Sequence, residues 1–153
     1  NLNAIFRSLI RIQKASEMTI VLPLHPRTKK QMTELLHEDL RSELDSNVGI
    51  KIIDPAGFLD IISLEKNANM MITDSGGLQK EAFFFQKPCI ILRPQTEWVE
   101  IVNNGNAMLT DADEARIWSA YETLSNKKDY TYPPFYGDGK AAEFICEQIN
   151  RLL

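Results

Sequence analysis

The fold is decided by the stretch Ile72-Thr73-Asp74-Ser75-Gly76-Gly77-Leu78-Gln79-Lys80-Glu81-Ala82. It begins as the apolar end of a strand, passes through a polar turn with two glycines and continues with helical spacing. Leu78, Ala82 and Phe85 recur at i, i+4 and i+7, which places them on one face of a helix. A strand, a tight turn and a helix in this order indicate one unit of a parallel α/β sheet.

Short apolar runs rich in branched residues occur on both sides of this unit. They lie at residues 18–22, 50–53, 70–72, 89–92 and 107–109. The runs are nearly continuous rather than alternating, as burial on both faces of a sheet requires. Because each intervening segment is long enough for a crossover helix, the sequence predicts a doubly wound, Rossmann-like parallel sheet within a single domain over residues 1–153.

The composition is that of an ordinary domain. The 153 residues carry 17 Lys and Arg against 21 Asp and Glu, and the net charge of −4 offers no basic stripe for a phosphodiester backbone. No apolar run approaches the roughly 20 residues that span a bilayer, and we expect no signal peptide. Neither nucleic acid nor a membrane is therefore an expected partner.

The two cysteines bear on the compartment. Cys89 lies in an apolar run and Cys146 lies in a helical pattern, so both are expected to be buried thiols rather than a disulfide. Free thiols are typical of a reducing compartment, and we expect a cytoplasmic protein.

Both ends of the chain have helical patterns. Residues 2–12 form the helical half of a βαβ unit, and we expect its strand to lie upstream, in a longer protein. Residues 113–124 and 139–153 predict two further helices, separated by an aromatic and proline-rich connector at 130–136 that cannot itself be helical. We expect this connector to cross the surface.

The turn after residue 73 has the chemistry of an anion site. Gly76 and Gly77 lack a Cβ, so an outside group can approach free amides and the positive end of the helix closely. Ser75 can donate its hydroxyl, and Glu81, one helical turn after Gly77, can accept hydrogen bonds from a diol such as ribose. Together they describe a nucleotide site. The alternative is that Asp74 or Ser75 only caps the helix and the glycines only permit close packing.

Loops after the first two predicted strands should reach the same sheet edge. The first brings His25 and Arg27 there, either to meet a diphosphate or to act as structural groups. The second offers Phe58 and Ile61, which either flank a base or, by default, pack in the core.

The loop after residue 92 is a further candidate. Arg93 can pair with phosphate or with a neighbouring carboxylate, and Thr96 can cap a helix that begins at Glu97. Trp98 can either stack on a ligand or pack in the interior.

More motifs accompany the turn at fixed spacing. Residues 73–81 are followed by Lys87-Pro88, Arg93, Thr96-Glu97 and a Gly-Asp-Gly within residues 136–141. With this set the chain resembles the non-hydrolysing UDP-N-acetylglucosamine 2-epimerases from end to end. It departs from the common family pattern at Trp98-Val99, where many members have Arg-Pro, and at Lys80, where a second Glu is common.

The resemblance implies a two-domain fold like that of the glycosyltransferase B enzymes, with this chain as the C-terminal, UDP-binding half. Helices 113–124 and 139–153 are then expected to pack toward the N-terminal domain. Family members remove the C2 proton of the sugar and eliminate UDP to give a 2-acetamidoglucal, then add UDP back with inverted C2. No metal or redox cofactor is implied, and the full-length protein is expected to be a homodimer.

The resemblance also assigns roles to residues. Ser75, Gly76 and Gly77 would hold the diphosphate, Glu81 the ribose and the Ile61 region the uracil. The carboxylates that move the proton belong to the other half, so the catalytic residues are expected outside this chain. The chain alone is therefore expected to bind UDP weakly at best and not to epimerise.

Three other interpretations remain at this point. The chain could be the donor-binding half of a glycosyltransferase, although the Gly-Asp-Gly after the connector argues against this. It could be a nucleotide-sugar sensor without chemistry, since it carries no obvious acid/base pair. The third interpretation is an α/β domain with no ligand.

Overall fold

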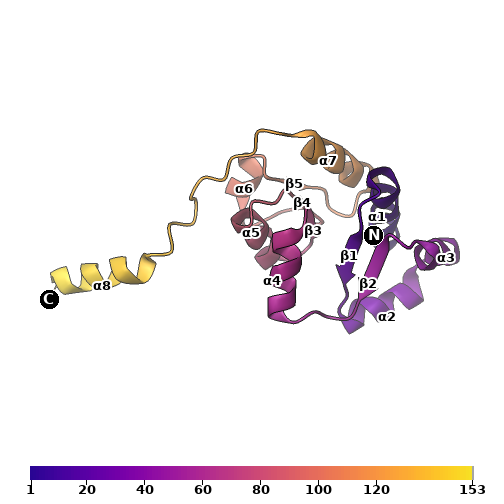
Figure 1. Ribbon diagram of the computed structural model, residues 1–153, viewed down its shortest axis with the longest axis horizontal. Helices are drawn as coiled ribbons and strands as arrows, with labels where there is room; N and C mark the ends of the chain where they lie inside the picture. The colour runs from indigo at the N-terminus through magenta and orange to yellow at the C-terminus, as the bar shows by residue number, and fades with distance from the viewer. Residues whose placement is uncertain (153) are drawn as a thin grey trace.

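The computed structural model describes residues 1–152, in which helices and strands alternate along the chain (Figure 1). In chain order the elements are α1 (Leu2–Ser16), β1 (Ile20–Pro23), α2 (Pro26–Leu35), α3 (Glu38–Ser46), β2 (Ile50–Ile53), α4 (Phe58–Asn67), β3 (Met71–Thr73), α5 (Gly76–Phe84), β4 (Cys89–Ile91), α6 (Val99–Asn103), β5 (Ala107–Leu109), α7 (Glu114–Asn126) and α8 (Ala141–Leu152). The α/β class is confirmed. No helix in this part of the chain has the length and apolar character needed to cross a bilayer.

All strand pairs are parallel, as predicted, but the hydrogen-bonded ladder is interrupted. β1 pairs with β2, and β4 lies between β3 and β5, while no ladder joins β1 to β3 among these strands. In the doubly wound order 3-2-1-4-5-6, the second and fourth strands flank a strand that precedes the first helix. β1 and β3 each pair on one side only.

Helices cover the sheets and bury three clusters of apolar residues. Ile90 and Ile91 of β4 are fully buried. On one side, Ile12 of α1 packs with Ile117 and other residues of α7 against β4. The apolar face of α7 is occupied within this domain, and packing of α7 and of the last helix toward a second domain stays a prediction.

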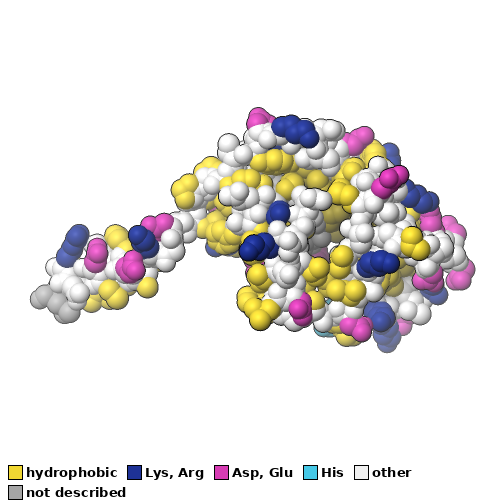
Figure 2. Space-filling view, in the orientation of Figure 1, with side chains coloured by type: hydrophobic (Ala, Val, Ile, Leu, Met, Phe, Trp, Pro, Cys, Tyr) yellow, Lys and Arg dark blue, Asp and Glu magenta, His cyan; other side chains and the backbone are white. Residues whose placement is uncertain are grey.

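α8 stands apart from the body of the molecule at the end of an extended connector (Figures 1 and 2). None of its residues is buried, and Phe144, Ile145 and Ile149 are more than half exposed. Cys146 is exposed as well. The prediction that Cys146 is a buried thiol is therefore wrong, because α8 has no core to pack on; Cys89 is buried, and burial raises its pKa to about 12.

We predict that the backbone amides of α8 exchange with solvent far faster than those of α7. Helices shorter than roughly 12–15 residues are marginal in water unless they pack on something, and α8 has 12 residues, all outside the core. α7 has 13 residues and buries Ile117, Ala120 and Leu124, which makes it a matched control. Hydrogen exchange read by NMR or mass spectrometry would contradict the prediction if both helices were equally protected.

The connector before α8 is more deeply packed than expected. Tyr132 and Tyr136 pack on Phe83 of α5, with ring centroids 5.3 and 5.9 Å away, and the Tyr130 hydroxyl donates to the Leu124 carbonyl at 2.6 Å. The connector thus runs along the surface as expected, with these three aromatic side chains partly buried. The physical reason is that the aromatic rings of this non-helical segment remove apolar surface from water when they pack on α5.

Candidate nucleotide site

The turn between β3 and α5 presents two free backbone amides. Ser75 is the N-cap of α5, and its Oγ accepts from the amide of Leu78 at 3.5 Å. Gly76 and Gly77 occupy the first two helical positions, whose amides have no intrahelical acceptor. Neither amide has a partner elsewhere among residues 1–152. The capping alternative is thus correct for Ser75, and the amides beside it stay available for an anion.

Close packing alone does not explain the two glycines. A Cβ on Gly76 would lie 3.5 Å from Glu97 Oε2 and 3.6 Å from Arg93 Nη1, and a Cβ on Gly77 would lie 3.8 Å from Ser75 Oγ. These are ordinary contact distances, and neither glycine has a positive φ. That an outside group approaches these amides stays a prediction.

Arg93 lies beside this turn and is held by Glu97. Its Nη1 and Nη2 donate to the two carboxylate oxygens at 3.0 and 2.9 Å. This bond lowers the pKa of Glu97. A guanidinium has five N–H donors, and three remain for another acceptor. Of the two roles predicted for Arg93, the structure contains the carboxylate pair and leaves donors for a phosphate.

Side chains of the loop after β4 form hydrogen bonds that hold the turn between β3 and α5 in place. The Trp98 Nε1 donates to the carbonyl of Gly76 at 2.8 Å. Thr96 accepts from the Trp98 amide at 3.1 Å and its hydroxyl donates to Oε1 of the buried Gln79 at 2.5 Å. Thr96 is therefore not a helix cap, since α6 begins at Val99, two residues later than predicted. Trp98 packs in the interior and buttresses the turn.

A lysine in an aromatic cluster links α5 to the connector. The Nζ of Lys80 lies 4.7 Å from the ring centroid of Trp98, 4.3 Å from that of Tyr136 and 5.8 Å from that of Phe84. Cation–π contacts of this kind are attractive because the ring faces are negative. Two of the three residues at which the chain departs from the common pattern, Lys80 and Trp98, are thus in contact with each other.

Glu81 and Ile61 come from different helices, α5 and α4. Both are half-buried. One turn after Ile61, Glu65 is buried, and burial followed by the charge of Glu81 raises the pKa of Glu65 to about 7. The sequence analysis missed Glu65, although an acidic residue on the inward face of a helix is a visible signal. Phe58, by contrast, is 73% exposed, so its expected core packing is wrong.

His25 and Arg27 lie after β1 and are both exposed. The Nδ1 of His25 accepts from the amide of Arg27 at 3.2 Å and thereby caps α2. Lys29 reaches Asp54 after β2 at 3.3 Å. No hydrogen bond or salt bridge within residues 1–152 joins His25 or Arg27 to the turn at Gly76, so their contact with a diphosphate stays a prediction.

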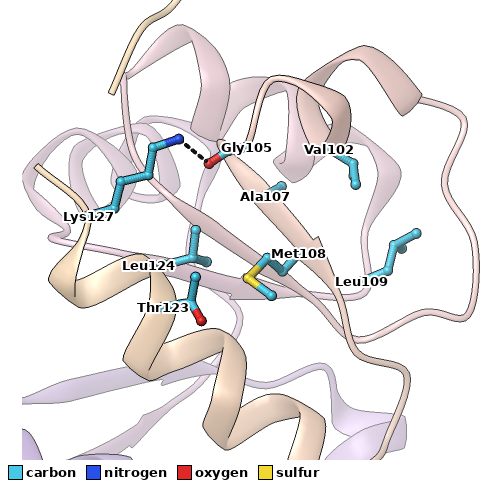
Figure 3. A pocket seen from close by; sticks show the side chains of 8 residues that line it. All are labelled: Val102, Gly105, Ala107, Met108, Leu109, Thr123, Leu124 and Lys127. Atoms are coloured by element: carbon cyan, nitrogen blue, oxygen red, sulfur yellow. Dashed lines mark hydrogen bonds between the residues drawn. The ribbon is translucent and has the colours of Figure 1, made fainter. Parts of the chain in front are cut away.

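One pocket lies away from this turn. It has a volume of about 390 Å³ and runs between the outer edge of β5 and the end of α7 (Figure 3). Its cation, Lys127, donates to the Gly105 carbonyl at 3.0 Å and is not directed at a ligand. None of the predicted site residues lines it. Within residues 1–152 no group of three or more His, Cys, Asp or Glu is arranged to hold a metal ion.

Comparison with known proteins identifies the family of the chain. The sequence model of the family described as UDP-N-acetylglucosamine 2-epimerase matches residues 1–150. The UDP-N-acetylglucosamine 2-epimerase of Methanocaldococcus jannaschii is 40% identical over 97% of this chain and 40% of its own length. The UDP-2,3-diacetamido-2,3-dideoxy-D-glucuronate 2-epimerase of Pseudomonas aeruginosa is 39% identical over 99% of this chain and 40% of its own length.

A solved structure is also similar. The crystal structure of Methanocaldococcus jannaschii UDP-GlcNAc 2-epimerase in complex with UDP-GlcNAc and UDP has a TM-score of 0.81 at 38% identity, over 98% of this chain and 40% of that chain. The chain thus spans about 40% of the length of these relatives. It belongs to the UDP-N-acetylglucosamine 2-epimerase family.

Proposed function

We propose that the chain is the UDP-binding part of a non-hydrolysing UDP-N-acetylhexosamine 2-epimerase. The observation that carries the proposal is the pair of unpartnered amides of Gly76 and Gly77, next to the Ser75 hydroxyl at the N-terminus of α5. Backbone amides and the positive helix end together favour a phosphate group. Arg93, whose charge is paired with Glu97, adds three further N–H donors beside the turn.

This site would act on the leaving group of the reaction. Loss of the C2 proton and cleavage of the bond between C1 and the UDP oxygen give a 2-acetamidoglucal and UDP. Negative charge develops on the diphosphate, and preoriented amides stabilise it without reorganisation. UDP then returns to C1 as a proton is added to C2 from the opposite face. Groups that move this proton would lie in the second domain.

The remaining part of the protein would cover the exposed surfaces. The uncovered apolar side chains of α8 suit packing against the second domain, and the full-length protein would be a homodimer. Free Cys89 and Cys146 suit a reducing compartment, for which we propose the cytoplasm.

Titration of UDP into the chain by calorimetry tests the proposal. We expect UDP to bind and uridine, which lacks the diphosphate, to bind much more weakly. Ser75→Ala should weaken UDP binding by about tenfold, because a hydrogen bond to a charged group contributes roughly 1.5–3 kcal/mol and part of it is replaced by water.

The matched control is Ser75→Thr, which keeps both the hydroxyl and the cap and should bind like the parent chain. Equal affinity for UDP and uridine would contradict a diphosphate site at this turn. The chain alone should not convert UDP-N-acetylglucosamine, and turnover by residues 1–153 would contradict the division between the two domains.

A further inference from the structure

Glu65 is a buried carboxyl group without a hydrogen-bond donor. Only 4% of the residue is exposed, and neither Oε1 nor Oε2 has a partner among the described residues. Buried polar groups are nearly always paired, because an unpaired one loses its hydration without compensation. An apolar residue would pack at this place in α4 at no such cost. The presence of Glu65 therefore calls for a function.

Glu81 in α5 is the charged group that acts on Glu65, because its charge, after burial, raises the pKa of Glu65. Lys66, the next residue in α4, is exposed, and no Lys, Arg or His of residues 1–152 forms a salt bridge with Glu65. Two ionised carboxylates only accept hydrogen bonds and repel each other, whereas one proton turns the same contact into an O–H···O bond. The pair is favourable when it holds a single proton.

We propose that Glu65 is a positioning residue whose protonated carboxyl group donates a hydrogen bond to Glu81 and thereby holds the Glu81 carboxylate toward the ribose of UDP. The inference rests on the proposed function, which gives the ribose to Glu81. One oxygen of the Glu81 carboxylate would accept the hydrogen bond from Glu65, and the other oxygen would accept hydrogen bonds from the ribose hydroxyls. Glu65 itself would not touch the nucleotide.

The order of residues along the two helices suits this arrangement. Ile61 and Glu65 are four residues apart in α4, and Gly77 and Glu81 are four apart in α5, so each pair shares one helix face. The uracil contact proposed at Ile61, the ribose contact at Glu81 and the diphosphate contact at Gly77 then follow the order of the groups in UDP. The Glu65 and Glu81 pair lies between the two ends.

The arrangement makes ribose recognition dependent on pH. Burial and the charge of Glu81 raise the pKa of Glu65 from 4.5 to about 7. Below that value the proton is present and Glu81 is held. As the pH rises through this pKa, Glu65 loses its proton. The hydrogen bond to Glu81 is then lost, and the two carboxylates repel each other. Recognition of the ribose hydroxyls should therefore weaken above pH 7.

The test compares UDP with 2′-deoxy-UDP by calorimetry on the 153-residue chain. Both ligands carry the same diphosphate, so the ratio of their dissociation constants cancels the titration of the phosphate. For one hydrogen bond to a charged acceptor we expect a ratio of about ten near pH 6, falling toward about two near pH 8.5.

Two variants separate positioning from a purely structural role. Glu65→Gln has an amide donor at every pH and should keep the ratio high near pH 8.5. Glu65→Met has similar size but no donor and should have a low ratio at both pH values. If Glu65→Gln loses discrimination with pH as the parent chain does, or if Glu65→Met discriminates like the parent chain, the inference is overturned.

A readout without nucleotide separates this inference from the proposed function. Carbon-13 NMR of the Glu65 carboxyl should give a pKa near 7 that falls in Glu81→Gln but stays above 4.5, because burial, the larger cause, remains. A value that does not move in Glu81→Gln overturns the contact itself. If UDP binds but the ratio of the dissociation constants of 2′-deoxy-UDP and UDP does not change with pH, only the role of Glu65 is overturned. If UDP does not bind at any pH, the proposed function is overturned, and the role of Glu81 toward the ribose with it.

Discussion

Gly76→Asp is expected to abolish UDP binding while the chain stays folded. The new Cβ fits, because it lies 3.5 Å from Glu97 Oε2 and 3.6 Å from Arg93 Nη1, but its carboxylate occupies the space in front of the free amides. It also repels the diphosphate. Two charges about 4 Å apart interact by about 4 kcal/mol at an effective dielectric constant near 20, so the dissociation constant should rise at least about a hundredfold.

Gly76→Ala is the matched control, since it adds the same Cβ without the charge and should weaken UDP binding by much less. The unfolding midpoint of Gly76→Asp should stay close to that of the parent chain, because an acidic residue in the first turn of a helix is favourable. UDP binding by Gly76→Asp with the affinity of the parent chain would remove the diphosphate from this turn.

Ile90→Ala should lower the free energy of unfolding by about 2–5 kcal/mol, as is typical when a fully buried aliphatic side chain is truncated. Ile90 has no exposed surface and lies in β4, between β3 and β5, where it packs with Ile12 of α1 and Ile117 of α7. Domains of this kind are stable by only about 5–15 kcal/mol, so a large part of the stability would be lost. Urea unfolding followed by circular dichroism measures the effect.

The control for this variant is Val48→Ala, at a residue that is 85% exposed. It should change the free energy of unfolding by less than about 0.5 kcal/mol, as is usual for surface positions. Ile90→Val removes one methylene and should cost about 0.5–1.5 kcal/mol. Equal midpoints for Ile90→Ala and the parent chain would contradict the central place of β4 in the core.

Local sequence patterns predicted the elements wherever burial and backbone preference agree. The strands at 50–53 and 107–109 have the predicted bounds, and the turn at Ser75 is both a helix cap and a candidate anion site, as its residue types indicate. Runs of branched apolar residues are strong signals because they suit strands buried on both faces. The resemblance to the family rested instead on the polar and glycine motifs and their spacing, and the family is confirmed.

Contacts between elements distant in sequence could not be predicted in the same way. Glu65 faces Glu81 only because α4 and α5 lie together, and the Lys80 contact with Tyr136 depends on the path of the connector. Cys146 was expected to be buried because its helix is amphipathic, but a helical pattern does not say whether a partner surface is present. Position in the fold, rather than residue type, decides such cases.

The interruption between β1 and β3 affects how the chain behaves on its own in solution. Two separate sheets have four strand edges in place of the two that a continuous sheet would have. The additional edges carry amides and carbonyls without ladder partners, and Val21 of β1 is 40% exposed. Such edges recruit strands from other molecules, so concentrated samples of the chain should self-associate, and any extended segment inserted there would gain hydrogen bonds on both of its sides.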